Sequence, residues 1–135
     1  MILVDAGPLV AIVHGSDAFH EPCSDVFRSL KRPPLVVWPA VTEAMHLLNF
    51  SWKAQDALWE LLENGSVVLA DLTPVDIPRM RQLAKQYRDL PMDLADAALV
   101  CVAERERISR VFTLDRKDFR IYRPRGVGRF SILPS

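Results

Sequence analysis

The chain has 135 residues, of which 50% are hydrophobic and 25% are charged, and its 17 basic and 17 acidic side chains give zero net charge. This length predicts a single domain, 1–135, and is too short for two. No apolar run approaches the ~18 residues of a membrane-spanning helix, and Asp5 interrupts the opening run 1–4, so we expect neither a membrane span nor a signal peptide. Cys23 and Cys101 form no metal-binding motif or disulfide framework, so we expect two reduced, buried thiols in a cytoplasmic protein.

The charges are distributed unevenly along the chain. Residues 1–104 carry 8 Lys and Arg against 14 Asp and Glu, whereas residues 105–135 carry 9 against 3. One interpretation is a rim that binds phosphates beside an acidic cleft, and the other is a solvated surface that happens to be basic. The charge pattern alone does not decide between them.

Short apolar runs alternate with longer amphipathic segments from the N-terminus onward. Ser51 is placed to cap one helix, Asn64-Gly65 to end it, and Thr73-Pro74 to start the next. The predicted strands are 1–4, 35–38, 67–70, 111–114 and 130–133. The predicted helices open at Gly7-Pro8, run over 20–31, open at Pro39, run over 52–63, run from 74 to about 88, and follow Pro91, and a basic irregular stretch follows residue 114. This alternation predicts a three-layer α/β/α sandwich with a central, mostly parallel sheet.

Four acidic residues lie where strands or helices are expected to end or begin: Asp5, Glu43, Asp96 and Asp115. Because the carboxyl ends of parallel strands meet at one edge of a sheet, we expect these side chains to converge. Two carboxylates about 5 Å apart repel by roughly 3 kcal/mol at an effective dielectric constant of 20, so a cluster must be protonated, paired with cations or occupied by a metal ion. We favour a metal ion, and carboxylate oxygens are the ligands that Mg²⁺ and Mn²⁺ prefer.

Each acid also has a structural interpretation. Asp93 and Asp96 are three residues apart on one helix face, and Asp93 is well placed to interact with the helix N-terminus. Asp96 lies one turn further on among apolar residues, where capping does not explain it.

The other acids have comparable alternatives. Asp5 is a suitable turn residue before Gly-Pro, and Glu43 is a suitable solvated residue in the first turn of a helix. Asp115, with Thr113 two residues before it, is able to cap the segment 116–118. Asp118 competes with Asp115 for the same role, and we interpret it as structural.

Four sequence blocks, 1–9, 39–44, 90–97 and 113–119, resemble the signature blocks of PIN domains, and specifically of VapC-like toxins from bacterial toxin–antitoxin pairs. Each block alone is a weak signal, but the four occur in the expected order and span nearly the whole chain. The resemblance assigns the catalytic, metal-binding acids to Asp5, Glu43, Asp96 and Asp115. It makes Asp93 an accessory acid and Thr113 a polar helper.

The resemblance implies an endoribonuclease that depends on Mg²⁺ or Mn²⁺ and cleaves RNA phosphodiester bonds. It also implies a homodimer and a cognate antitoxin protein; the absence of membrane association is expected from the short apolar runs. Arg116, Lys117 and Arg120 are then candidates to hold the RNA backbone. Apolar residues of helices 20–31 and 52–63, including Trp52 and Trp59, belong either to the core or to a dimer or inhibitor surface.

Three other functions compete with this hypothesis. A catalytically inert module of the same fold would bind RNA or a protein partner without cleaving RNA. An aspartyl-phosphate phosphatase would need a second acid two residues after Asp5, and that position is Gly7. A receiver-like signalling domain would need adjacent acids near the first strand, which the chain does not clearly provide.

Overall fold

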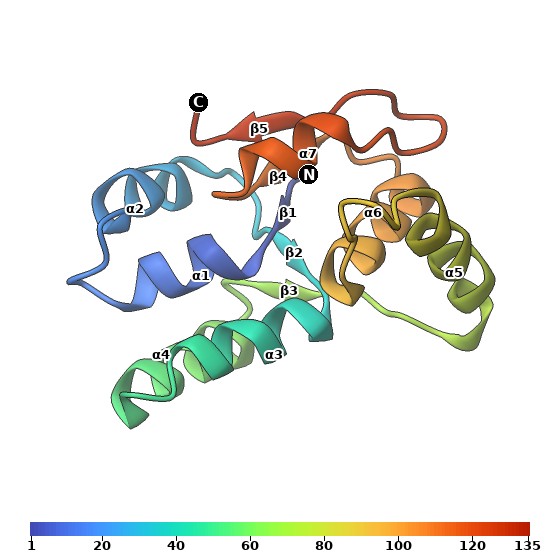
Figure 1. Cartoon of the computed structure of the whole chain (residues 1–135). Coiled ribbons are helices and arrows are strands. Elements are labelled where there is room, and N and C mark those ends of the chain that lie inside the picture. The colour runs from blue at the N-terminus through green and yellow to red at the C-terminus, as the bar shows by residue number, and fades with distance from the viewer.

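Five short parallel strands form one sheet at the centre of the computed structural model, which describes all residues 1–135 (Figure 1). The strands are β1 (Leu3–Val4), β2 (Leu35–Val36), β3 (Val68–Leu69), β4 (Arg110–Phe112) and β5 (Ser131–Leu133). Their order across the sheet is β3-β2-β1-β4-β5, and every neighbouring pair is parallel. The carboxyl ends of all five strands therefore lie along the same edge.

The strand that carries Asp5 lies in the middle of the sheet. Leu3 in β1 is aligned with Leu35 in β2 on one side and with Val111 in β4 on the other. The Asp5 amide continues the β1–β4 ladder by donating to the Phe112 carbonyl over 2.9 Å. Asp5 and the residues that follow β4 are consequently held next to each other by backbone hydrogen bonds.

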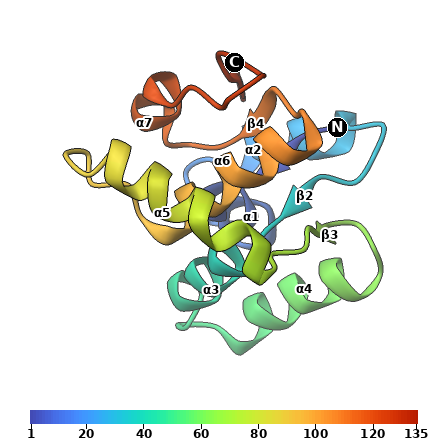
Figure 2. The same ribbon diagram turned by 90° about the vertical axis from the view of Figure 1, so that its right-hand side faces the viewer.

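Helices cover both faces of the sheet and complete the predicted three layers. The helices are α1 (Ala6–Val13), α2 (His20–Ser29), α3 (Trp38–Leu47), α4 (Trp52–Glu63), α5 (Ile77–Gln86), α6 (Leu94–Glu106) and α7 (Arg116–Ile121), with a 3₁₀ turn, η1 (Pro74–Asp76), before α5. Helices α1 to α4 lie on one side of the sheet, and α5 and α6 lie on the other, as two perpendicular views show (Figures 1 and 2). No helix is long and apolar enough to cross a membrane.

Local sequence signals explain several helix starts. The Ser51 hydroxyl accepts a hydrogen bond from the Ala54 amide over 3.2 Å, so the predicted cap and the predicted helix 52–63 are both confirmed. Thr73 and Asp76 form a reciprocal capping box at η1. These caps satisfy amide groups that otherwise lack partners at a helix start.

Two predictions about local structure were wrong. Trp38, assigned to the strand 35–38, is the first residue of α3 and is 51% exposed, because Pro39 fits the first turn of a helix and the chain leaves the sheet after Val36. The stretch after residue 114, predicted to be irregular, contains the six-residue helix α7. Fewer than two turns give no readable helical period, so only the Asp115 cap signalled this helix.

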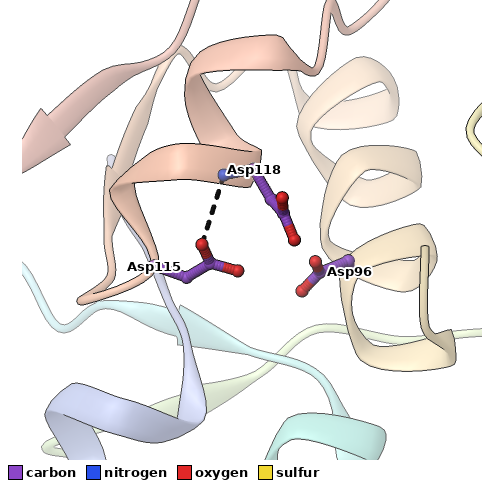
Figure 3. Close-up of side chains that lie close together, drawn as sticks. All are labelled: Asp96, Asp115 and Asp118. Atoms are coloured by element: carbon purple, nitrogen blue, oxygen red, sulfur yellow. Dashed lines mark hydrogen bonds between the residues drawn. The ribbon is translucent and has the colours of Figure 1, made fainter. Parts of the chain in front are cut away.

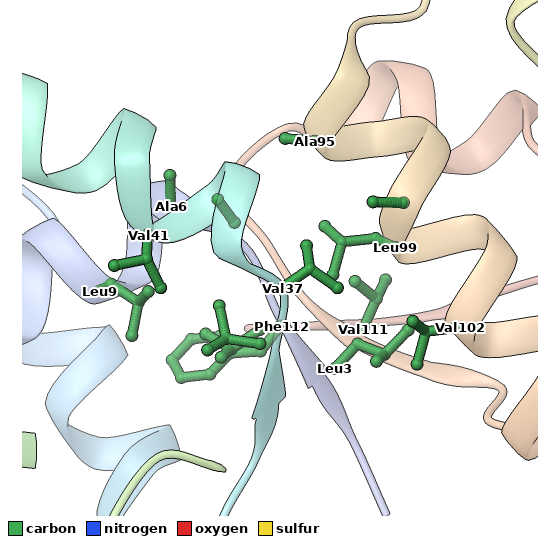
Figure 4. Close-up of a cluster of buried hydrophobic side chains, with 14 of the residues drawn as sticks. Leu3, Ala6, Leu9, Val37, Val41, Ala95, Leu99, Val102, Val111 and Phe112 are labelled. Carbon is green, nitrogen blue, oxygen red and sulfur yellow. The ribbon is translucent and has the colours of Figure 1, made fainter. Parts of the chain in front are cut away.

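The core consists of aliphatic and aromatic side chains between the sheet and the helices (Figure 4). Strand β1 is buried on both faces, as expected for a central parallel strand. Helix α6 contributes a continuous buried run from Ala95 to Ala103, and its alanines allow close approach to the sheet. Both cysteines are free and buried, which confirms that prediction. The core thus fixes the position of α6, and with it Asp96.

We predict that Leu99→Ala destabilises the protein by about 2–5 kcal/mol, because Leu99 is fully buried between α6 and the sheet and its truncation leaves a cavity. Leu94→Ala on the same helix is the matched control. Leu94 is 62% exposed, so this change should alter the free energy of unfolding by only about 0.5 kcal/mol or less. Urea denaturation of both variants measures the difference. Equal decreases in the free energy of unfolding would show that the buried face of α6 contributes no more to stability than its exposed face.

Candidate active site

The N-terminus of α6 places two acids side by side at the carboxyl edge of the sheet. Asp93 is the N-cap residue, and its Oδ1 accepts a hydrogen bond from the Asp96 amide over 2.8 Å. The structural interpretation of Asp93 as a helix-start residue is therefore confirmed. Asp96 lies one turn into the helix and is only 7% exposed.

A tyrosine fixes the orientation of the Asp96 carboxylate. The Tyr122 hydroxyl donates to Asp96 Oδ2 over 2.7 Å, and its ring is fully buried. The ring packs edge-to-face against Tyr87 and Phe119, with centroid separations of 5.0 and 5.2 Å. Sequence reasoning missed Tyr122 because a single aromatic residue after a basic segment carries no recognisable spacing.

A continuous hydrogen-bond chain links β1 to the end of β4. The Asp115 amide donates to Thr113 Oγ1, and the Thr113 hydroxyl donates to Asp5 Oδ2, each over 3.0 Å. Asp5 Oδ1 also accepts from the Ala6 amide over 2.8 Å, so Asp5 caps α1. Thr113 is fully buried, and its hydroxyl holds one oxygen of Asp5 in place.

Three carboxylates approach one another most closely. An oxygen from each of Asp96, Asp115 and Asp118 lies within 4.8 Å of the other two. Figure 3 shows the three side chains directed toward a common point, from α6, from the turn after β4 and from α7. Asp115 Oδ1 also caps α7 by accepting from the Asp118 amide over 3.2 Å.

Asp118 is the acid whose position the sequence did not reveal. We interpreted it as structural, but its carboxylate lies in the closest group of three. The signal available was its spacing: Asp118 is three residues after Asp115, so a helical turn brings the two side chains together. That turn was not predicted, and the pairing was missed with it.

Glu43 and Asp93 are exposed. Both interact electrostatically with the acids of the cluster, since Asp5 and Asp115 repel the Glu43 carboxylate and Asp93 repels that of Asp96. The pKa of the Glu43 carboxyl is raised, chiefly because neighbouring groups shield the carboxyl in part from water, and also by the negative charges of Asp5, Asp93 and Asp115. All four acids predicted from strand and helix ends therefore share one electrostatic environment.

Burial, with a smaller contribution from neighbouring negative charges, shifts Asp5 and Asp118 toward their neutral forms. Burial raises the pKa of Asp5, and repulsion from Asp93 and Asp115 adds to the effect, whereas the hydrogen bonds from Ala6 and Thr113 oppose it. Burial likewise raises the pKa of Asp118, with Asp115 adding repulsion.

Asp96 is the most strongly perturbed acid. Its pKa is raised to about 8, with burial as the main cause and the hydrogen bond from Tyr122 as the opposing one. Repulsion from Asp5, Asp93 and Asp115 contributes further. Without a compensating cation, Asp96 thus retains its proton at neutral pH.

The donor atoms fit a hard divalent cation. The acids of this group take part in none of the four salt bridges of the protein, so no Lys, Arg or His neutralises them by direct pairing. All the converging ligands are carboxylate oxygens, which suit Mg²⁺ or Mn²⁺ rather than the softer transition metals. A bound divalent ion would remove the repulsion that raises these pKa values.

Helix α7 places the predicted basic residues next to the acids. Lys117 is next to Asp118 in the chain, and its positive charge partly opposes the burial and the repulsion that raise the pKa of Asp118. The Arg116 guanidinium donates to the Pro134 carbonyl and so is held against the end of β5. Arg120 is exposed on the same helix.

A family model of the PIN domain matches residues 2–123, which include every acid described above. The chain belongs to the PIN-domain family. Among curated proteins, it is similar to Ribonuclease VapC26 of Mycobacterium tuberculosis, with 30% identity over 136 residues that cover 98% of this chain and 100% of the relative. The resemblance to VapC-like PIN domains is thereby confirmed.

Two solved structures share the PIN fold seen here. One is VapC20 from Mycobacterium tuberculosis, described as a toxin that cleaves the sarcin–ricin loop, with a TM-score of 0.79, 18% identity, and coverage of 87% of this chain and 92% of that chain. The other is a toxin–antitoxin complex from Klebsiella pneumoniae, with a TM-score of 0.68, 15% identity, and coverage of 88% and 90%. At these identities the comparison confirms the predicted fold.

We predict that Tyr122→Phe raises the pKa of Asp96 above its value of about 8. The variant loses the hydrogen bond from the Tyr122 hydroxyl, which in the wild type stabilises the ionised carboxylate. Tyr87→Phe is the matched control, since Tyr87 packs on the same ring but its hydroxyl accepts from the Arg123 amide. Carboxyl NMR titration in the presence of a chelator measures both. An unchanged Asp96 titration in Tyr122→Phe, or the same change in the control, would contradict the assignment.

We also predict that Asp96→Asn stabilises the metal-free protein at high pH. The pKa of Asp96 in the folded protein, about 8, lies above the unfolded value of about 3.9, so the wild type loses stability as pH rises between the two. Asparagine carries no charge. The free energy of unfolding of the variant should therefore exceed that of the wild type by about 2–5 kcal/mol at pH 9 and equal it near pH 4.

Urea denaturation with chelator at both pH values tests this expectation, with the exposed Asp56→Asn on α4 as the control. A variant that is no more stable than the wild type at pH 9 would show that the site does not disfavour the charged form of Asp96.

Proposed function

We propose that this protein is a metal-dependent endoribonuclease and the toxin of a toxin–antitoxin pair. The observation that supports this most directly is the convergence of Asp96, Asp115 and Asp118 beside Asp5 at the carboxyl edge of the sheet. This group belongs to a PIN domain whose relative is named Ribonuclease VapC26. RNA phosphodiester bonds are therefore the proposed substrate.

In this proposal Asp5, Asp96, Asp115 and Asp118 hold Mg²⁺ or Mn²⁺, and Glu43 lies at the rim of the same site. When bound, the cation supplies positive charge that offsets the charge building up on the phosphodiester oxygens. Asp118 is our addition to the set expected from the sequence, and its proximity to Asp96 and Asp115 supports it.

The remaining residues orient these acids. Tyr122 fixes Asp96 through Oδ2, so Asp96 Oδ1 stays free of this contact. Thr113 fixes Asp5 through Oδ2, and the Ala6 amide donates to Asp5 Oδ1, so both oxygens of Asp5 are held in place. Such fixed geometry reduces the reorganisation needed during reaction. Glu43 has a raised pKa and an exposed side chain, which suit it to accept a proton from the attacking water at a carboxylate oxygen. Asp93 is the alternative acid for orienting that water.

The basic side chains of α7 would hold the RNA next to the acids. Lys117 and Arg120 are exposed on this helix, and Lys117 lies close to Asp118. Arg116 is fixed by its hydrogen bond to Pro134 and is intermediate in exposure. Phosphate contacts of this kind position a nucleic acid without reading its bases.

We further propose a cognate antitoxin, a homodimer and a cytoplasmic location. The exposed apolar side chains of α3, of α4 and of the turn between them support a protein-binding surface in this region: Trp38 is 51% exposed, Leu47 49%, Phe50 60%, Trp52 74% and Trp59 50%. The alternative that Trp52 and Trp59 belong to the core is wrong.

The central prediction is that Asp96→Asn lowers the rate of RNA cleavage by roughly 10²-fold or more while the fold is retained, because a buried carboxylate of the cation site is lost. Cleavage of labelled RNA is measured with Mn²⁺ and with chelator, and the control is Asp56→Asn, which removes an exposed acid on α4. Wild-type cleavage should require the metal, and the control should match the wild type.

The same assay tests the rival function. A catalytically inert PIN module predicts RNA binding without cleavage in wild type, with or without Mn²⁺. Metal-dependent activity retained by purified Asp96→Asn would refute the assignment of Asp96.

A further inference from the structure

A hollow of about 390 Å³ opens at the amino edge of the sheet, opposite the acids. Its walls come from the start of β1, the end of α2 with the turn that follows, and the first residue of β4. The charged side chains in these walls are Lys31, Arg32 and Arg110, and no acidic side chain is among them. We call this hollow the Lys31–Arg110 pocket.

The three cations have no partners within the protein. None of them takes part in a salt bridge or a side-chain hydrogen bond, and all three are exposed. Two arginines elsewhere differ in this respect: Arg79 pairs with Glu104 at 2.7 Å, and Arg105 pairs with Asp76 at 2.9 Å. The pocket therefore holds uncompensated positive charge in a concave surface.

Helix chemistry explains only part of this arrangement. Lys31 and Arg32 follow the C-terminus of α2, where the helix dipole favours cations. That dipole is equivalent to roughly half an elementary charge, which is small against three full positive charges. Arg110 comes from the start of β4, and it reaches the other two only because β1 and β4 are adjacent in the sheet.

We propose that the Lys31–Arg110 pocket binds a backbone phosphate of the RNA at a distance from the point of cleavage. The inference rests on the proposed function in taking RNA as the polyanion. Two guanidinium groups and an ammonium group match the oxygens of a phosphate in charge and in hydrogen-bonding geometry.

The geometry also sets the class of RNA. Parallel strands run from this pocket toward the acids, so about five residues separate Arg110 from Asp115, or roughly 16 Å of extended chain. A dinucleotide bound at the acids would not reach the pocket. A longer or folded RNA that passes around the edge of the molecule would reach both.

The test is RNA binding by the triple variant Lys31→Gln, Arg32→Gln and Arg110→Gln. Its control, Lys53→Gln, Arg81→Gln and Lys85→Gln, removes the same charge from exposed positions on α4 and α5. Fluorescence anisotropy with a labelled RNA hairpin, in chelator and over a range of salt concentrations, gives the dissociation constant and its salt dependence. We expect affinity about tenfold weaker than in the control, and a salt dependence reduced by about one phosphate contact.

Cleavage assays with Mn²⁺ on the same proteins complete the test. The pocket variant should cleave a dinucleotide at the wild-type rate and the hairpin more slowly at limiting concentration. The double variant Lys31→Gln and Arg32→Gln, confined to an exposed turn, supplies the same comparison if replacement of Arg110 impairs folding.

The two proposals fail separately. If wild type cleaves RNA but the pocket variant binds the hairpin as tightly as the control does, the pocket is not an RNA site, and that includes the case in which it binds an acidic protein segment. If wild type does not cleave RNA but loses affinity when the pocket is altered, the pocket proposal stands and the nuclease proposal fails. A wild type without affinity for RNA overturns the pocket proposal.

Discussion

Repulsion between carboxylates at the carboxyl edge of the sheet is the constraint on which the rest of this structure depends. At about 5 Å, each pair costs roughly 3 kcal/mol at an effective dielectric constant of 20, a large fraction of the stability of a small domain. The cost is tolerated because the acids lie on elements fixed by the core. The residues around Asp5 are held by the central β1–β4 ladder, and Asp96 is carried on α6, whose buried run packs against the sheet. The fold therefore maintains a negative site that the side chains alone would disperse.

The same acids that create the repulsion also help to offset it. Asp5 caps α1, Asp93 caps α6 and Asp115 caps α7, so three helix N-termini face the site. Amide groups at these N-termini carry partial positive charge and satisfy one oxygen of each capping carboxylate. The structural and functional interpretations of these acids are thus not exclusive, since only one oxygen of each carboxylate accepts the hydrogen bond from the capped amide. Asp96 does not cap a helix, and its pKa is raised to about 8.

Charge is separated across the sheet as well as along the chain. Acids gather at the carboxyl ends of the strands, whereas Lys31, Arg32 and Arg110 surround a hollow at the opposite edge. At the carboxyl edge, α7 carries basic residues beside the acids, and Lys117 is next to Asp118 in the chain. A polyanion approaching this surface would meet positive charge before it reached the negative site, and long-range attraction of this kind raises association rates. The zero net charge conceals this arrangement.

The sequence by itself determined the fold class, the position of most elements and the four acids at strand and helix ends, because alternating apolar runs and capping residues are local signals. It also indicated the family, through short blocks that keep their order along the chain. Only the tertiary structure decided which side chains meet. Tyr122 reaches Asp96 across 26 residues, Asp118 joins Asp96 through a helix too short to show a period, and Arg110 meets Lys31 through strand pairing. Contacts of this kind depend on how elements pack, and no local pattern in the chain encodes them.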